Sequence, residues 1–120
     1  MNSVCLVGNI TFDPELQHTA SGTPRCRFQV ACNRRKKTPS GEWEDAADFV
    51  YVTAFDRTAE NVAKFLRKGN KVGVTGRLNA GTYEKEGKKV AFCDVVALNV
   101  EFLTPRSAAV TDQEEDKVPF

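Results

Sequence analysis

The sequence predicts a fold dominated by β-strands (all-β) with a single α-helix, as one domain over residues 1–104 followed by a short tail over 105–120. Two observations predict these elements. Apolar and polar residues alternate over 25–33 and 48–55, which is the period of a strand with one buried face. Apolar residues recur at helical spacing once, between about 56 and 68.

The first two strands are predicted at 4–10 and from residue 25 onward. VCLVGNI (4–10) is short, apolar and β-branched, and HTASGTP (18–24) is typical of a turn. In the second strand the alternation directs one set of side chains inward, namely Cys26, Phe28, Val30 and Cys32. The other set points outward and comprises Arg25, Arg27, Gln29 and Asn33.

The third strand, 48–55, is unusual in carrying aromatic rings on its outer side. Its inner face is predicted to be Val50, Val52 and Ala54, and its outer face carries Phe49, Tyr51 and Phe55. A half-exposed strand normally has polar groups there. The preceding segment RRKKTPSGEWED (34–45) is predicted to be a charged loop that joins the second and third strands.

The helix and the last two strands complete the predicted fold. Asp56 or Thr58 can cap the helix, and Gly69 suits its end. The fourth strand is predicted at 71–78 (KVGVTGRL), where its glycines suit a bend. A long hairpin at 80–90 (AGTYEKEGKKV), with its turn near Glu86-Gly87, joins it to the fifth strand. The fifth strand, 90–103, is apolar on both faces. Five strands with one helix between the third and fourth form the OB-fold, a Greek-key barrel that commonly binds oligonucleotides or oligosaccharides. An open α+β sheet would show a similar pattern.

Charge is distributed unevenly along the chain. Residues 1–106 contain 16 Lys/Arg and 12 Asp/Glu, whereas 107–120 contain one Lys and four acids. Six of the basic residues fall within 25–37, which has no acid. A basic body favours a polyanionic partner, and the acidic end is one that this body can attract.

Several functional classes are excluded by the composition. No apolar run approaches the roughly 20 residues that span a bilayer, and the first residues resemble no export signal, so we expect a cytoplasmic protein with no membrane partner. Four cysteines (Cys5, Cys26, Cys32, Cys93) and one histidine (His18) show no metal-binding spacing, so we expect reduced thiols, no metal and no cofactor. No arrangement of catalytic side chains suggests an enzyme.

Several stretches resemble bacterial single-stranded-DNA-binding proteins. They are NSVCLVGNITFDPEL, DFVYVTAFDRTAENVAKFLRKGNKVGVTGRL and the terminal DKVPF, which together cover roughly residues 2–103 and 114–120. The resemblance implies an OB-fold domain that forms a homotetramer and wraps single-stranded DNA with little sequence preference. It also implies an acidic tail that recruits replication, recombination and repair proteins, and a location in the cytoplasm at the nucleoid.

Such binding needs flat rings for the bases and cations for the phosphates. The predicted stacking residues are Phe49, Phe55, Tyr83, Trp43 and Tyr51, and the resemblance places Phe49, Phe55 and Tyr83 at family stacking or tryptophan positions. The predicted phosphate contacts are Arg25, Arg27, Arg34, Arg35, Lys36, Lys37, Arg77, Lys85, Lys88 and Lys89. The alternative for the rings is burial in a subunit interface. The loop position where family members often place tryptophan is basic here, near Lys36, and Trp43 lies among acids a few residues later.

The tail is predicted to be a disordered partner-binding peptide formed by Glu114, Glu115, Asp116, Val118, Pro119 and Phe120. The Phe120 ring would enter an apolar pocket while a cation holds the α-carboxylate. The family's long linker is reduced here to about ten residues (104–113), and Lys117 departs from the family pattern. The alternatives are a tail that only aids solubility, and a primosome-type adaptor that bridges proteins and binds nucleic acid weakly. The residues themselves do not separate a dimer from a tetramer, or RNA from DNA.

Overall fold

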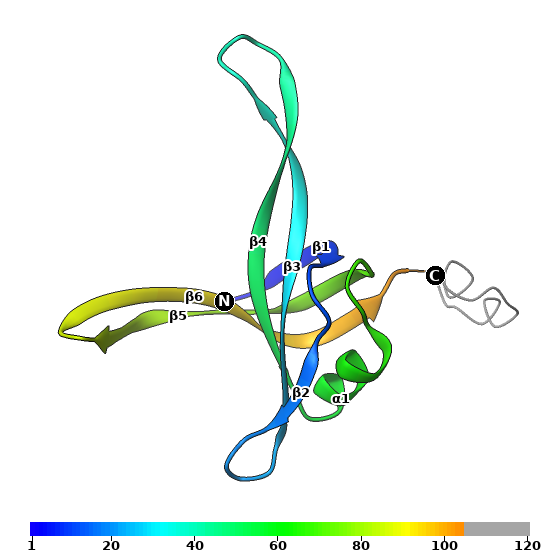
Figure 1. The fold of residues 1–120 in the computed structure, drawn as a ribbon, viewed down its shortest axis with the longest axis vertical. Coiled ribbons are helices and arrows are strands. Elements are labelled where there is room, and N and C mark those ends of the chain that lie inside the picture. Colours follow the sequence, from blue (N-terminus) through cyan, green and yellow to red (C-terminus); the bar gives the residue numbers. More distant parts are fainter. Residues whose placement is uncertain (105–120) are drawn as a thin grey trace, which may run out of the picture.

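The computed structural model describes residues 1–104, and within them it contains six strands and one helix (Figure 1). In chain order these are β1 (Val4–Ile10), β2 (Glu15–His18), β3 (Pro24–Lys37), β4 (Trp43–Phe55), α1 (Asp56–Phe65), β5 (Lys71–Lys85) and β6 (Lys88–Phe102). The predicted tail, 105–120, lies outside the described residues. None of the helices in 1–104 is long and apolar enough to cross a membrane.

Five of the strands close into a barrel. The order in the sheet is β1-β5-β6-β4-β3-β2, and β1 also pairs with β3 through Asn9 with Ala31 and Ile10 with Val30. That additional pairing closes the ring and leaves β2 as an extra strand beside β3. The closed barrel, with α1 between β4 and β5, confirms the predicted OB-fold and excludes the open sheet.

The core fills the barrel with the side chains that the alternation directed inward. Phe28 and Val30 of β3 and Val52 of β4 are fully buried, and Val95 of β6 lies beside Val52 in a short parallel pairing. The helix packs against β3 and β4 and buries Ala59 and Val62, and Leu66, which directly follows the helix, is buried with them. Each fully buried aliphatic or phenyl side chain contributes about 1.5–3 kcal/mol relative to an exposed one.

Gly76 allows β5 to bend tightly around the barrel. A Cβ atom at this position would collide with the carbonyl oxygen of Val96, and the register of β5 against β6 shifts between Thr75 and Gly76. Only glycine permits so close a backbone approach. The bend that the sequence predicted in 71–78 is therefore present.

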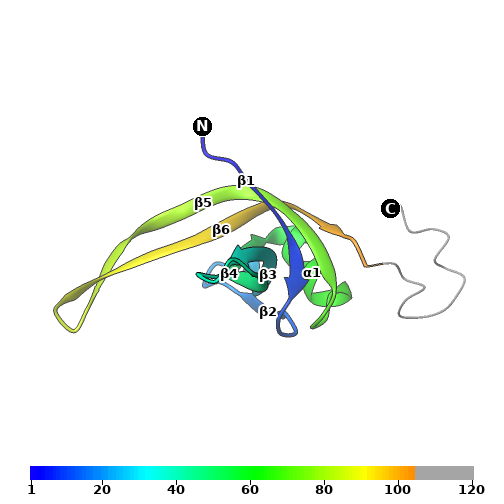
Figure 2. The same cartoon turned by 90° about the horizontal axis from the view of Figure 1, so that it is seen from above.

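Two long hairpins extend from the barrel as arms, roughly perpendicular to each other (Figure 1). The β3–β4 arm, residues 33–47, stays paired as far as Lys37 with Trp43, and the β5–β6 arm, residues 79–94, as far as Lys85 with Lys88. Figure 2 shows the β5–β6 arm curving away from the barrel, with β3 and β4 seen end-on beneath it. The arms give the molecule extents of 55 × 54 × 28 Å.

The predicted loop over 34–45 is wrong, because most of it is paired strand. The actual turn is 38–42, where the Thr38 N–H donates to the Glu42 carbonyl oxygen at 2.7 Å and Gly41 has φ +93°. An arm exposed on both faces loses the apolar alternation that marks a strand, although its ladder of hydrogen bonds continues. The turn predicted at Glu86-Gly87 is present, with φ values of 53° and 78°.

The helix is shorter than predicted and is capped differently. It ends at Phe65, and the Arg67 guanidinium donates hydrogen bonds to the carbonyl oxygens of Ala63 at 2.9 Å and Leu66 at 2.7 Å. No side chain caps its first turn, so the predicted Asp56 or Thr58 cap is wrong. Asp56 adopts φ +57°, which turns the chain sharply from β4 into the helix.

The four cysteines are free thiols in the structure. Cys26 is fully buried in the core, and burial raises the pKa of its thiol from 9.0 to about 11. The pKa of Cys32 is also raised, first by burial and then by the negative charge of Asp48. Within residues 1–104 no three His, Cys, Asp or Glu side chains are grouped to hold a metal ion.

Candidate nucleic-acid interface

The rings of β4 lie on the outside of the barrel, as the alternation predicted. Phe49 is 63% exposed, Tyr51 38% and Phe55 37%, while their strand neighbours Val52 and Ala54 are buried. We call the outward side chains of β3, β4, β5 and β6 the outer face. Within residues 1–104, nothing covers these rings fully.

The outer face is continuous across four strands. Arg27 of β3 lies opposite Thr53 of β4, Thr53 lies beside Val96 of β6, and Val96 lies opposite Arg77 of β5. Thr53 is buried among these neighbours. This row joins the two arms, so the rings on β4 and those on the β5–β6 arm belong to one surface with an arginine at each end of the row.

The β5–β6 arm adds a pair of rings to this surface. Tyr83 and Phe92 are both exposed, and their ring centroids are 6.1 Å apart with the planes tilted by 40°. Phe92 lies opposite Gly81, and a Cβ added to Gly81 would come within 3.0 Å of the Phe92 Cζ atom. The ring therefore rests on bare backbone, an arrangement by which an aromatic side chain covers a strand glycine.

Phe92 was not predicted as a site residue. Its strand is predicted to be apolar on both faces, and in such a strand a single ring carries no separate signal. The pairing register of the hairpin could have identified it. With the turn at Glu86-Gly87, Phe92 falls opposite Gly81 and on the same side of the hairpin as Tyr83.

Tyr51 holds an arginine on one face of its ring. The Arg27 Cζ atom lies 4.0 Å from the ring centroid of Tyr51, which is a close cation–π contact. One face of Tyr51 is therefore occupied in the free protein. Both residues line a groove of about 550 Å³ that is completed by Phe12, Asp13, Glu15, Gln17 and Arg25. We call this the β2 groove.

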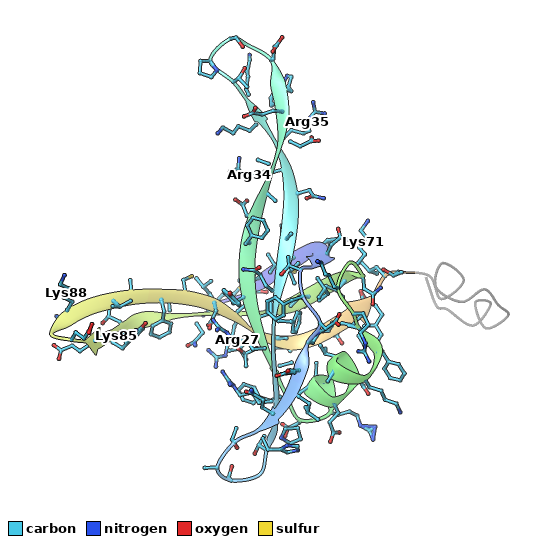
Figure 3. All side chains as sticks on the ribbon, viewed as in Figure 1. Arg27, Arg34, Arg35, Lys71, Lys85 and Lys88 are labelled. Atoms are coloured by element: carbon cyan, nitrogen blue, oxygen red, sulfur yellow. The ribbon has the colours of Figure 1, made fainter. Side chains whose placement is uncertain are left out.

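Two of the predicted phosphate contacts on the β3–β4 arm are already paired with acids. The Arg34 Nε atom lies 3.1 Å from Asp48, and the Arg35 Nε atom lies 3.5 Å from Asp45. Exposed pairs of this kind contribute about 0–1 kcal/mol to stability, but they lower the positive charge offered to a phosphate. Figure 3 shows both arginines along this arm.

The remaining cations divide between the two sides of the arms. Arg34 and Lys36 are an even number of positions from the core residues Cys26 and Val30, so they face the same side of β3 as the core residues do. On the arm they therefore lie on the side opposite to Phe49. The cations that share the side of the outer-face rings are Arg25, Arg27, Arg35, Lys37, Arg77, Lys85 and Lys88. Lys85 and Lys88 are directly opposite each other at the tip of the β5–β6 arm (Figure 3), where two like charges favour an anionic partner. Lys89, opposite Glu84, is on the other side of that arm.

Trp43 stands alone at the far end of the β3–β4 arm. It is exposed, and the Lys37 ammonium lies 6.0 Å from its ring centroid. It lies six positions before Phe49 along β4, which corresponds to a distance of roughly 20 Å in a strand. The structure therefore groups Phe49, Tyr51 and Phe55 on the barrel but places Trp43 at a distance from them.

A closed OB-fold barrel whose outer face carries exposed rings beside arginines and lysines is typical of proteins that bind single-stranded nucleic acid. Comparison with known proteins agrees with this class. The single-strand binding protein family model matches residues 1–103, and the chain belongs to this family. It is accordingly a binding protein and not an enzyme.

The chain is similar to curated proteins over most of its length. It is 44% identical over 115 residues to a single-stranded DNA-binding protein of Staphylococcus aureus (strain MRSA252), covering 95% of this chain and 72% of that protein. It is 42% identical over 112 residues to single-stranded DNA-binding protein 1 of Clostridium acetobutylicum, covering 92% of this chain and all of that one.

Among solved structures, the fold is similar to that of the Plasmodium falciparum single-strand binding protein in its complex with single-stranded DNA. The TM-score is 0.78 at 20% identity, and the match covers 86% of this chain and 95% of that one. At this identity the likeness concerns the fold.

Proposed function

We propose that this protein binds single-stranded DNA with little sequence preference, by stacking bases on outer-face rings and pairing phosphates with nearby cations. The observation that carries the proposal is the row from Arg27 to Arg77, which joins the rings of β4 to those of the β5–β6 arm. A strand of DNA that follows this row passes from the rings of β4 to those of the β5–β6 arm, with an arginine at each end of the row. The names of the relatives support the same ligand.

The proposed stacking residues are Phe49, Phe55 and Tyr83, with Phe92 beside Tyr83 and with Trp43 and Tyr51 as further candidates. Each stacked base contributes about 1–3 kcal/mol. The proposed phosphate contacts are the predicted ten cations. Those with the best support share the side of the rings, have no acid pair in residues 1–104 and are not stacked closely on a ring; they are Arg25, Lys37, Arg77, Lys85 and Lys88. A competition assay between a labelled single strand and unlabelled duplex tests the proposal: duplex should compete at least a hundredfold less well, and equal competition would contradict it.

We further propose that the protein acts as a homo-oligomer, with a tetramer as the expected form. Along Val4–Gly8 the strand β1 pairs with β5 alone, so its other edge has free backbone groups. Apolar side chains remain exposed nearby, with Val7 56% and Leu98 68% accessible. An oligomer would place several outer faces on one DNA strand and so raise the overall affinity. Light scattering at several concentrations measures this, and a monomer at micromolar concentration would contradict it.

The acidic segment is proposed to recruit proteins of DNA replication, recombination and repair, in the cytoplasm at the nucleoid. The sequence supports this by placing four acids among Asp112–Asp116 and then Val118, Pro119 and Phe120. A cationic, apolar groove on a partner would fit such a segment. Removing residues 114–120 should abolish capture of partner proteins while DNA binding persists. Unchanged partner capture would contradict the proposal.

A further inference from the structure

We propose that the β2 groove binds one nucleobase and favours cytosine and adenine, which carry an amino group where thymine carries its O4 carbonyl oxygen, over thymine. This inference rests on the proposed function, because the groove opens beside Tyr51 on the outer face where the single strand would run. It adds a site with a base preference to a surface whose other rings stack on any base.

The first support is the fixed guanidinium of Arg27. In the strand register Arg27 lies directly opposite Glu15 of β2, which would be its natural ion-pair partner. Within residues 1–104, however, the ion pairs are those of Arg34 and Arg35, and Arg27 instead stacks on Tyr51 at 4.0 Å. A planar guanidinium held on one face by a ring offers its other face to a base, which is a common way of binding unstacked nucleotides.

The second support is the set of hydrogen-bond acceptors beside that guanidinium. Glu15 and Gln17 lie opposite Arg27 and Arg25, so their side chains project into the same groove. Asp13 is fixed at the edge because its Oδ1 atom accepts a hydrogen bond from the Lys68 N–H at 2.8 Å. Two carboxylates repel a phosphate but accept hydrogen bonds from N–H groups. Beside these two carboxylates a base fits better than a phosphate.

The acceptors also distinguish between bases. Cytosine presents its N4 amino group and adenine its N6 amino group as donors, and carboxylate and amide side chains are their usual partners. Thymine and uracil present a carbonyl oxygen at the matching position, which a carboxylate repels. The groove should therefore stabilise cytosine relative to uracil, although the two rings have the same size.

Oligo(dC) and oligo(dU) are the matched probes, because they share the backbone and the size of the ring. Cytosine has an amino group at position 4 and no proton on N3, whereas uracil has a carbonyl oxygen at position 4 and a proton on N3. At pH 8 we expect the full-length protein to bind oligo(dC) about three- to tenfold more tightly than oligo(dU). Glu15→Ala should weaken oligo(dC), strengthen oligo(dU) and bring the ratio close to one. Glu60→Ala removes the same charge from the exposed surface of α1, outside the groove, and should leave the ratio unchanged.

A second pair of variants tests the stacked arginine. Tyr51→Phe keeps the ring under Arg27 and should keep the preference for oligo(dC), whereas Tyr51→Leu removes it and should lose the preference. Tight binding of both oligonucleotides with a ratio near one in the unmodified protein would overturn this inference and leave the proposed function standing. Weak binding of both would overturn the proposed function, and this inference with it.

Discussion

Tyr83 and Phe92 stand side by side on the β5–β6 arm, with ring centroids 6.1 Å apart, and Phe92 rests on the backbone of Gly81. The two rings together form a platform wider than either alone. Because Gly81 has no side chain, the Phe92 ring can lie directly over its backbone.

Gly81→Ala should therefore weaken single-strand binding without unfolding the protein. The new Cβ atom would lie 3.0 Å from the Phe92 ring, closer than an ordinary contact, so the ring must move. We expect a loss of about threefold to tenfold in affinity, at or below the lower end of the 1–3 kcal/mol that one stacked base contributes, because the ring is displaced and not removed. The double variant Gly81→Ala with Phe92→Ala should bind like Phe92→Ala alone, and additive losses would contradict this explanation.

Removing the rings of β4 should have a larger effect. Phe49→Ala and Phe55→Ala are each expected to lower the affinity for oligo(dT) by about ten- to a hundredfold, since one base loses its stacking partner in each. Phe65→Ala is the matched control, because Phe65 is a phenyl ring on α1, away from the outer face, with an exposure between those of Phe55 and Phe49. Equal effects of Phe49→Ala and Phe65→Ala in a fluorescence titration would show that the β4 rings have no special role.

Salt dependence should separate free cations from those already paired with acids. Arg77→Gln removes a cation on the side of the rings, so the slope of log K against log salt should become about 0.7 less steep. Arg34 is engaged by Asp48 at 3.1 Å and lies on the other side of its arm, so Arg34→Gln should change the slope by much less. The reverse order of the two variants would mean that DNA runs along the opposite side of the β3–β4 arm.

The buried thiol of Cys26 should make the fold sensitive to alkaline pH. Its pKa is about 11 in the folded protein and 9.0 at its ordinary value, so the unfolded chain loses this proton first. The contribution is therefore fully present below pH 9 and is lost as pH rises toward 11. The thermal midpoint of the protein should fall more steeply between pH 9 and 11 than that of Cys26→Ala, and parallel curves for the two would contradict this.

Much of the barrel could be predicted from the sequence because its strands are half buried. Phe49 and Tyr51 were assigned to the outside, and Val52 to the core, by alternation alone, and the structure confirms that orientation. Polarity alternates wherever one face of a strand packs and the other meets water. Where both faces are exposed the signal is absent, which explains why the strand content of the β3–β4 arm was missed.

The same reason accounts for β2. All four residues of Glu15–His18 are exposed, and the strand exists through its backbone pairing with β3. The Arg27–Tyr51 contact also could not be predicted from the sequence, because it depends on the register of β3 against β4. It further depends on Arg27 stacking on a ring and not pairing with Glu15. The alternation in a sequence shows which side of its strand a residue faces. Which residues of two strands contact each other can be predicted only when the pairing register is known.

The central claim is that the outer face binds single-stranded DNA through rings and cations together. The most direct test is titration of labelled oligo(dT) into the full-length protein at two salt concentrations, with a duplex of matched length as the control. We predict tight binding of the single strand alone, with log K falling against log salt by a slope of about −0.7 for each phosphate engaged. Weak binding, or equal binding of the duplex, would contradict the claim and assign the exposed rings to contacts between subunits.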